Sequence, residues 1–119
     1  AAPAFLALAG PQVVAAGVSF GGRVATLAAA EQAFAAVIAF SFPLSGEAER
    51  RTAHWPRVNC RTLIVNGCDD ALAPGAELVR LMPLLPAGRL VQLAGAGHDL
   101  RPVLDEALGA AAGFLTELG

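Results

Sequence analysis

Short apolar runs alternate with longer stretches rich in alanine and leucine along almost the whole chain. The runs span 12–18, 36–42, 61–67 and 89–95, and the longer stretches span 20–32, 75–85 and 101–118. This alternation is typical of βα units, whose strands lie parallel. Because each run is continuously apolar, both faces of its strand should be buried. The sequence therefore predicts an α/β fold, with a parallel sheet of about four strands and helices on both faces.

Prolines and polar residues mark where these elements should end. Pro43 stops the second strand, and the polar stretch 43–59 after it is predicted to be irregular. Pro83 must kink or end the helix over 75–85, whereas Pro102 falls near a first turn, where its missing N–H is tolerated. No repeat or linker interrupts residues 1–119, which we interpret as a single domain.

Composition excludes several classes of protein. Hydrophobic residues make up 55% of the chain and charged residues 15%, which favours a folded core over disorder. The net charge is -2 and no lysine is present, so nucleic-acid binding is not expected. The apolar runs are too short for a membrane span, and no membrane association is expected. We interpret the apolar start, residues 1–10, as a short helix and not as a signal-peptide remnant.

Two cysteines and two histidines limit metal and redox chemistry. Cys60 and Cys68 flank the strand predicted over 61–67, too far apart for a disulfide. Two free thiols are typical of a reducing compartment, so a cytoplasmic location is expected. His54 and the cysteines lack close-paired ligand spacing, so no metal site is predicted. His54, beside Trp55, is interpreted as structural or peripheral.

A G-x-S-x-G pattern lies between the first strand and its helix, where a nucleophile elbow is found. In such an elbow the central Ser19 takes strained dihedrals, and Gly17 and Gly21 leave room for strand and helix to pass closely. The amide N–H of Phe20 would then point at a developing oxyanion. An ordinary βα turn can share this pattern, but a Rossmann fingerprint needs glycine at position 19 and a P-loop needs lysine.

Two further segments place a carboxylate and an imidazole where a Ser-Asp-His order requires them. Asp69 and Asp70 follow the third strand, and His98 follows the fourth. Because carboxyl ends of parallel strands share one edge, Ser19, one aspartate and His98 should meet there. His98 would take the Ser19 proton while the carboxylate fixes its tautomer. Spacing alone does not choose between Asp69 and Asp70.

The segments "GVSFGGRVA", "FPLSGEAERRTAHWP", "TLIVNGCDDALAP" and "GAGHDL" resemble the small α/β-hydrolases related to dienelactone hydrolase. The branch is largely bacterial and also includes a subunit of the eukaryotic non-specific lethal histone acetyltransferase complex. The resemblance implies an α/β-hydrolase fold, no cofactor, and an acid three residues after the glycine that ends the strand. Gly67 plus three gives Asp70, which leaves Asp69 as a turn residue and Asp99 as a loop or capping residue.

The chain departs from that family in two ways. Dienelactone hydrolase has cysteine at the elbow where this chain has Ser19, which favours ordinary ester chemistry. Family members also place several strands before the elbow, and a loop among them supplies a second oxyanion N–H. Only about ten residues precede the first strand here. We therefore expect a truncated fold, the C-terminal portion of a larger domain, whose open strand edge promotes dimerisation, pairing with another chain or poor solubility.

The favoured function is a serine hydrolase that cleaves a small-molecule carboxylic ester or thioester through an acyl-enzyme. The triad would be Ser19, Asp70 and His98. A non-catalytic scaffold that binds a protein partner, and an acyltransferase with the same triad, are the alternatives. Trp55, Phe40 and Phe42 are expected in the core more than in a substrate pocket.

Overall fold

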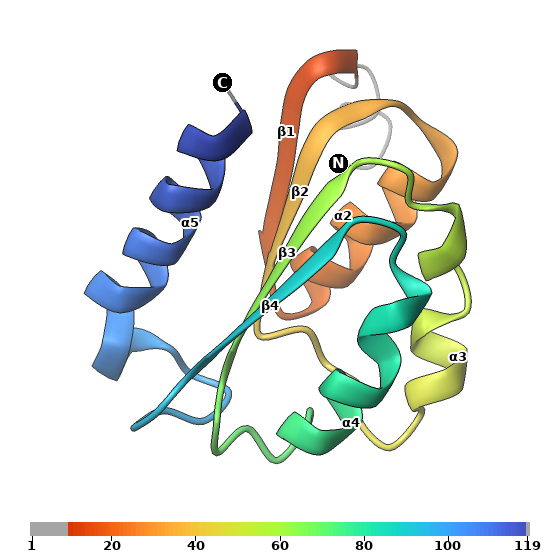
Figure 1. Ribbon diagram of the computed structural model, residues 1–119. Helices are drawn as coiled ribbons and strands as arrows, with labels where there is room; N and C mark the ends of the chain where they lie inside the picture. The colour runs from red at the N-terminus through yellow and green to blue at the C-terminus, as the bar shows by residue number, and fades with distance from the viewer. Residues whose placement is uncertain (1–9, 119) are drawn as a thin grey trace.

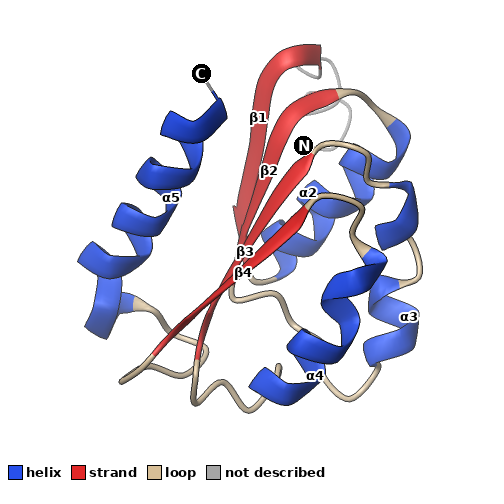
Figure 2. Cartoon of the chain, in the orientation of Figure 1, coloured by secondary structure: helices blue, strands red, loops and turns tan. Residues whose placement is uncertain are grey.

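The computed structural model describes residues 10–118, which form one four-stranded parallel sheet with strand order β1-β2-β3-β4. Figures 1 and 2 show α5 on one face of this sheet and α2, α3 and α4 on the other. The predicted fold class is therefore confirmed. The strands are β1 (Gly10–Val18), β2 (Phe34–Phe40), β3 (Arg61–Gly67) and β4 (Gly88–Leu93). The helix predicted over residues 1–10 falls almost wholly outside the described residues.

The helices follow the predicted stretches, with differences at the prolines. Pro83 ends α4 early and lies in a short 3-10 helix, and Pro102 lies in another that precedes α5. The stretch 43–59, predicted to be irregular, contains one short α-helix and one 3-10 helix. The α-helices are α2 (Phe20–Glu31), α3 (Ala48–Thr52), α4 (Gly75–Leu81) and α5 (Leu104–Leu118), and the 3-10 helices are η1 (Trp55–Arg57), η2 (Met82–Leu84) and η3 (Arg101–Val103).

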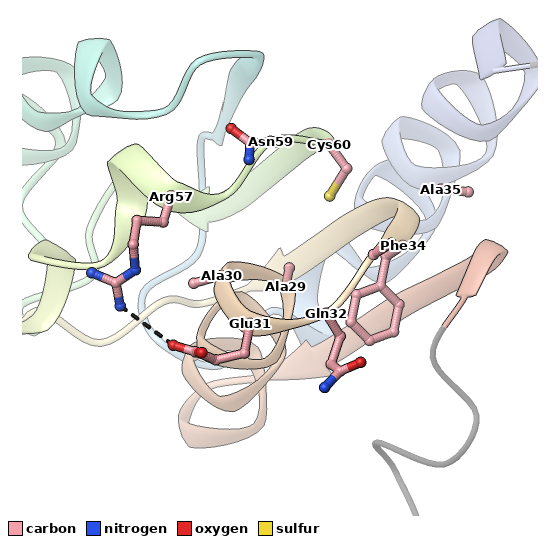
Figure 3. Close-up of a pocket in the computed structure, with 10 residues that line it drawn as sticks. Ala29, Ala30, Glu31, Gln32, Phe34, Ala35, Arg57, Asn59 and Cys60 are labelled. Atoms are coloured by element: carbon pink, nitrogen blue, oxygen red, sulfur yellow. Dashed lines mark ion pairs between the residues drawn. The ribbon is translucent and has the colours of Figure 1, made fainter.

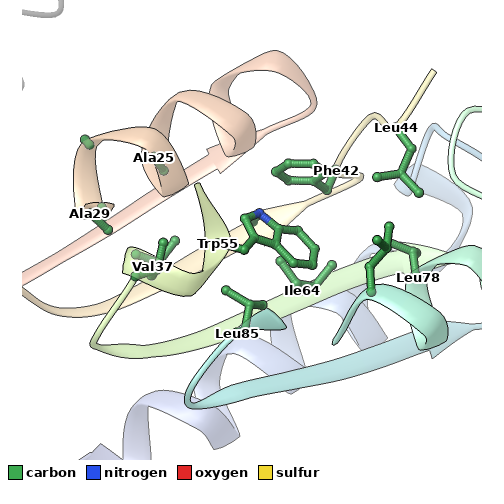
Figure 4. Close-up of a cluster of buried hydrophobic side chains, with 14 of the residues drawn as sticks. Ala25, Ala29, Val37, Phe42, Leu44, Trp55, Ile64, Leu78 and Leu85 are labelled. Atoms are coloured by element: carbon green, nitrogen blue, oxygen red, sulfur yellow. The ribbon is translucent and has the colours of Figure 1, made fainter. Parts of the chain in front are cut away.

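Two apolar clusters, one on each face of the sheet, make up the core. The larger lies under α2 and α4, where Trp55 and Phe42 pack edge to face with ring centroids 5.1 Å apart (Figure 4). The smaller joins the sheet to α5 through Ile38, Leu63 and Phe114. Trp55 and Phe42 are fully buried, as expected for core residues. The continuously apolar strands β2 and β3 thus contribute side chains to both clusters.

The outer strands are less well covered than the central ones. β1 has β2 as its one neighbour in the described sheet, and on the α5 side of β1 Val14 and Val18 are 36% and 65% exposed. Among the described residues, no helix combines the length and apolar character needed to cross a membrane.

Candidate active site

The turn from β1 into α2 has the strained geometry of a nucleophile elbow. Ser19 sits between the two elements with φ 54° and ψ −120°, a region that residues with a side chain rarely occupy. Its backbone N–H donates to the carbonyl of Phe40 at 2.7 Å, which ties the elbow to the end of β2. Phe20, the first residue of α2, keeps an N–H that has no intrahelical acceptor.

The glycines of the elbow are not equally constrained. A Cβ on Gly17 would lie 2.2 Å from the carbonyl oxygen of Gly21, so strand and helix pass too closely for any side chain there. A Cβ on Gly21 would meet nothing within 4 Å. We expected that Gly21 must lack a side chain so that strand and helix can pass closely. This steric reason is wrong for Gly21. Gly22 is the tighter position, because its Cβ would lie 3.1 Å from the Cβ of Ala39.

Ser19, His98 and Asp70 form one hydrogen-bonded chain at the carboxyl edge of the sheet. Ser19 Oγ lies 2.8 Å from His98 Nε2, and His98 Nδ1 lies 2.9 Å from Asp70 Oδ2. With its proton on Nδ1, His98 donates to the carboxylate and accepts from the hydroxyl. The three residues that the sequence pointed to are thus within direct contact, although Ser19 and His98 are 79 positions apart.

The two adjacent aspartates occupy different environments. Asp70 is 2% exposed, and its carboxylate also accepts from the backbone N–H of Leu72 at 2.9 Å and from Asn66 Nδ2 at 3.3 Å. Asp69 is exposed, and the carboxylate that is hydrogen-bonded to His98 is that of Asp70 and not that of Asp69. Asp70, the residue that the family resemblance favours, is therefore the aspartate that contacts His98.

Two polar residues that the sequence reading missed hold the loops of this site. Ser41, at φ 57° directly after β2, donates through Oγ to the carbonyl of His98 at 2.7 Å. Asn66, fully buried on β3, accepts from the N–H of Phe42 and donates to Asp70. For both Ser41 and Asn66, the one sequence signal of such a role was the presence of a polar residue at the end of an apolar strand. The partners lie on other loops, which sequence spacing does not reveal.

Close packing also joins the loop of Asp70 to the loop of His98. A Cβ on Gly67 would lie 2.3 Å from the carbonyl oxygens of both Ala96 and Gly97. Asp69 N–H donates to the Ala96 carbonyl at 3.0 Å. The glycine that ends β3 therefore lets the acid-bearing and histidine-bearing loops touch. Asp99, next to His98, accepts from the backbone N–H of Arg101 and pairs with its guanidinium.

His54 belongs to the core. It is 5% exposed, and its Nε2 lies 2.7 Å from Oγ1 of Thr26, whose hydroxyl donates to the carbonyl of Arg23. Thr26 has one proton to give, so Nε2–H of His54 must be the donor between them. Burial, followed by the charges of Arg23 and Arg57, lowers the pKa of His54 to about 4. His54 is thus neutral near pH 7.

The two cysteines are free thiols at opposite ends of β3. Cys68 is exposed, whereas burial raises the pKa of the half-buried Cys60 thiol. This agrees with the expectation that no disulfide joins them.

Two hollows differ in their relation to Ser19. One of about 270 Å³ lies beside His98, between the ends of β1 and β2 and the start of α5, with Val18, Phe40, Leu104 and Leu108 in its wall. Phe40 is thus partly a pocket residue. A larger one of about 510 Å³ lies at the opposite end of the sheet, where the Glu31–Arg57 ion pair crosses it (Figure 3). The hollow beside His98 is the one adjacent to the candidate site.

Comparison of the sequence with known protein families points to the same fold over nearly the whole chain. Residues 3–112 match the family described as an alpha/beta hydrolase domain. The chain belongs to this family. No curated protein matches this α/β hydrolase domain.

Solved structures share the fold at low sequence identity. E-2-(acetamidomethylene)succinate hydrolase superposes with a TM-score of 0.77 at 16% identity, covering 95% of this chain and 69% of that one. Est1E from Butyrivibrio proteoclasticus, with ferulic acid bound, has a TM-score of 0.75 at 20% identity and covers 87% and 58%. An alpha-beta serine hydrolase homologue from Coxiella burnetii has a TM-score of 0.69 at 24% identity and covers 80% and 45%. This α/β hydrolase domain therefore spans from under half to about two thirds of those chains.

Proposed function

We propose that this chain is a serine hydrolase that cleaves a carboxylic ester or thioester. Ser19 is the nucleophile, His98 the general base and Asp70 the acid that orients it. The observation that carries the proposal is the continuous contact from Ser19 Oγ to His98 Nε2 at 2.8 Å and from His98 Nδ1 to Asp70 at 2.9 Å. Hydrogen-bonded nucleophile, base and orienting acid are what acyl transfer through a hydroxyl needs.

Acylation follows from the positions of these atoms. Ser19 Oγ attacks the carbonyl carbon as its proton passes to His98 Nε2, and the carbonyl π electrons move to oxygen. The Phe20 N–H, at the positive end of α2, stabilises that oxyanion. Asp70 stabilises the imidazolium through Nδ1–H. Collapse of the intermediate breaks the bond to the leaving alcohol or thiol, which takes the proton from His98, and leaves an acyl-Ser19.

Deacylation repeats these steps with water. His98 takes a proton from water, whose oxygen attacks the acyl carbon, and then returns the proton to Ser19 as the carboxylic acid leaves. In the family that the sequence resembles, a second oxyanion donor comes from a loop before the elbow. Lack of one donor typically costs about 100-fold to 1,000-fold in turnover, so slow hydrolysis is expected where Phe20 acts alone.

Labelling by a fluorophosphonate tests the nucleophile directly. The folded chain should be labelled at Ser19 and should hydrolyse p-nitrophenyl butyrate above background, and Ser19→Ala should lose both. A folded chain that is not labelled, and that matches Ser19→Ala in rate, would contradict the proposal and favour the scaffold alternative. Product analysis with a competing alcohol separates hydrolysis from acyl transfer, because a transferase forms the new ester in preference to the acid.

We also propose that the domain belongs to the dienelactone-hydrolase-like branch that includes the non-specific lethal complex subunit. The G-x-x-D spacing from Gly67 to Asp70 supports this placement, and Ser19 in place of cysteine supports ester chemistry within it. Free Cys60 and Cys68 support a cytoplasmic location. The shared sheet between the two core clusters supports one domain, which we propose is the C-terminal portion of a larger one.

A further inference from the structure

Successive residues at the carboxyl end of β2 form hydrogen bonds to the nucleophile and the base of the candidate site. The carbonyl oxygen of Phe40 accepts the backbone N–H of Ser19 at 2.7 Å. Ser41 comes next in the chain, and its hydroxyl donates to the carbonyl oxygen of His98 at 2.7 Å. One strand end therefore holds both residues between which the proton of the reaction passes.

The following residue, Phe42, is linked to the acid through Asn66. The backbone N–H of Phe42 donates to Asn66 Oδ1 at 3.1 Å, and Asn66 Nδ2 donates to Asp70 Oδ2 at 3.3 Å. Phe42 and Asn66 are both fully buried, which shields this link from water. Asp70 Oδ2 is also the oxygen that accepts from His98 Nδ1. The segment 40–42 thus relates the positions of all three residues of the triad.

The backbone of Ser41 is tied to β3 and has an uncommon conformation. Its N–H donates to the carbonyl oxygen of Val65 at 2.7 Å, and the residue is 1% exposed. Its φ of 57° lies in the left-handed region, which a residue with a side chain adopts only where its surroundings enforce it. Ser19, the proposed nucleophile, has a positive φ as well. Because strained conformations of this kind gather at functional sites, the conformation of Ser41 points to a role there.

The position of His98 depends on contacts from outside its own loop. Residues 94–100 form neither helix nor strand, so no regular backbone pairing fixes them. The N–H of Asp69 holds this loop at the carbonyl of Ala96, two residues before the base. The hydroxyl of Ser41 holds it at His98 itself. A general base works only within about 2.6–3.2 Å of the group whose proton it takes, so a small shift of this loop matters.

We propose that Ser41 is a positioning residue, whose hydroxyl keeps the imidazole of His98 within reach of the Ser19 proton. The inference rests on the proposed function, because that function makes His98 the general base. Without the hydroxyl, the loop keeps its tie at Ala96 but loses the one at His98. A misplacement of about 1 Å can cost about 100-fold in rate, so the loss should appear in kcat. KM should change little, because the one proton of Ser41 is given to His98 and is not available to a substrate.

A purely structural role for Ser41 predicts a different order among its variants. Ser41→Ala loses the hydroxyl and keeps the strained φ, whereas Ser41→Gly loses the hydroxyl and adopts a positive φ without strain. Ser41→Gly should therefore be at least as stable as Ser41→Ala. If the rate follows stability, Ser41→Gly is the faster variant. If the rate follows the hydroxyl, as we propose, both variants are slow to a similar degree.

Steady-state kinetics with p-nitrophenyl butyrate test this, with each rate divided by the folded fraction that circular dichroism gives at the same temperature. Ser41→Ala and Ser41→Gly should both lower kcat by about 10-fold to 100-fold and leave KM within about threefold. Thr52→Val is the matched control, because the buried Thr52 hydroxyl donates to the carbonyl of Ala48 at 2.8 Å within α3, which carries no residue of the triad. It should keep kcat within about threefold of the unaltered chain.

Proton NMR provides a readout that does not require turnover. The Nδ1–H of His98, held by the buried carboxylate of Asp70, should give a downfield signal in the unaltered chain and in Thr52→Val. In both Ser41 variants that signal should broaden or disappear, because a displaced imidazole exchanges this proton with water.

Several results would overturn the role of Ser41. These are an unchanged kcat in the folded variants, a rate restored in Ser41→Gly, an equal loss in Thr52→Val, and a proton signal that persists in both Ser41 variants. If Ser41→Ala fails to fold, Ser41→Gly still decides, since glycine relieves the strain. Ser19-dependent hydrolysis that both Ser41 variants retain refutes the positioning role alone. A proton signal that depends on Ser41, in a chain without Ser19-dependent hydrolysis, refutes the hydrolase alone.

Discussion

Asp69 and Asp70 are neighbours with opposite surroundings, and they offer a matched test of the proposed mechanism. Asp70→Asn should lower kcat by about 10,000-fold, because an amide no longer stabilises the imidazolium or fixes the Nδ1–H tautomer of His98. Asp69→Asn should stay within about threefold of the unaltered chain, since an exposed side chain without contact to His98 makes no such contribution. Initial rates of p-nitrophenyl butyrate hydrolysis measure both. Equal losses in the two variants would contradict the assignment of Asp70.

His54 predicts how stability depends on pH. Its pKa is about 4 in the folded chain and near 6.5 when unfolded, so the unfolded state binds more protons between those values. Stability from this group is therefore fully present above about pH 6.5 and is lost as pH falls toward 4. Between pH 7 and 5 the loss is about 2 kcal/mol.

Urea denaturation of the unaltered chain and of His54→Gln at the two pH values isolates this effect, because other groups titrate equally in both. Glutamine keeps an N–H for Thr26 but does not titrate. The stability of His54→Gln should change with pH by about 2 kcal/mol less. Parallel pH profiles would show that His54 is not held neutral.

The roles of some residues could be predicted from the sequence, and those of others could not. Ser19 and His98 were identified because each follows an apolar strand in a motif-like turn. Ser41 and Asn66 were not, because their importance lies in contacts with residues on other loops. Ser41 meets His98 across 57 positions and Asn66 meets Phe42 across 24. No local pattern encodes such pairings.

At the scale of elements, the elbow glycines predict opposite effects of the same substitution. Gly17→Ala should destabilise the chain by at least about 2 kcal/mol, because its Cβ would overlap the Gly21 carbonyl at 2.2 Å. Gly21→Ala should be neutral or stabilise by up to about 1 kcal/mol, since its Cβ meets nothing and alanine favours the helix. Thermal unfolding monitored by circular dichroism measures both, and a Gly21→Ala loss as large as that of Gly17→Ala would contradict this reading.

Element types followed from the sequence more closely than element boundaries. β3 was predicted residue for residue over 61–67, because Arg61 and Gly67 bound its apolar run. β2 was predicted at 36–42 but spans Phe34–Phe40. Alanines on both sides of Phe34 hide where the helix ends and the strand begins. Pro83 and Pro102 lie in 3-10 helices where α-helix was predicted. The short 3-10 helix continues the helical course of the chain at a proline, which cannot donate a backbone hydrogen bond.

For the whole molecule, the buried central strands and the open outer strand have different consequences. β2 and β3 are covered on both faces, as continuous apolar runs predict. β1 has an equally apolar run but one neighbour among the described strands, and its α5 side exposes Val14 and Val18. The hydrophobic pattern alone did not predict the exposure of β1. An apolar run shows that a strand can be buried, but it does not show which elements cover it.

We expect this open strand to make two copies of the chain associate. From Val14 to Val18 its pairing with β2 is regular, so its free edge offers unpaired backbone groups beside apolar side chains. The register shift between Gly10 and Val14 disfavours pairing over the first part of β1. Association should therefore centre on residues 14–18.

Light scattering after size exclusion should show a mass that rises with concentration from one chain toward two. Val14→Lys should lower the dimer fraction, because charge on an edge strand opposes pairing. Val79→Lys, the same change at a 59% exposed site on α4, is the control and should leave association unchanged. Equal dissociation by both variants would assign the effect to net charge. A single-chain mass at every concentration would mean that the β1 edge does not pair with a second copy.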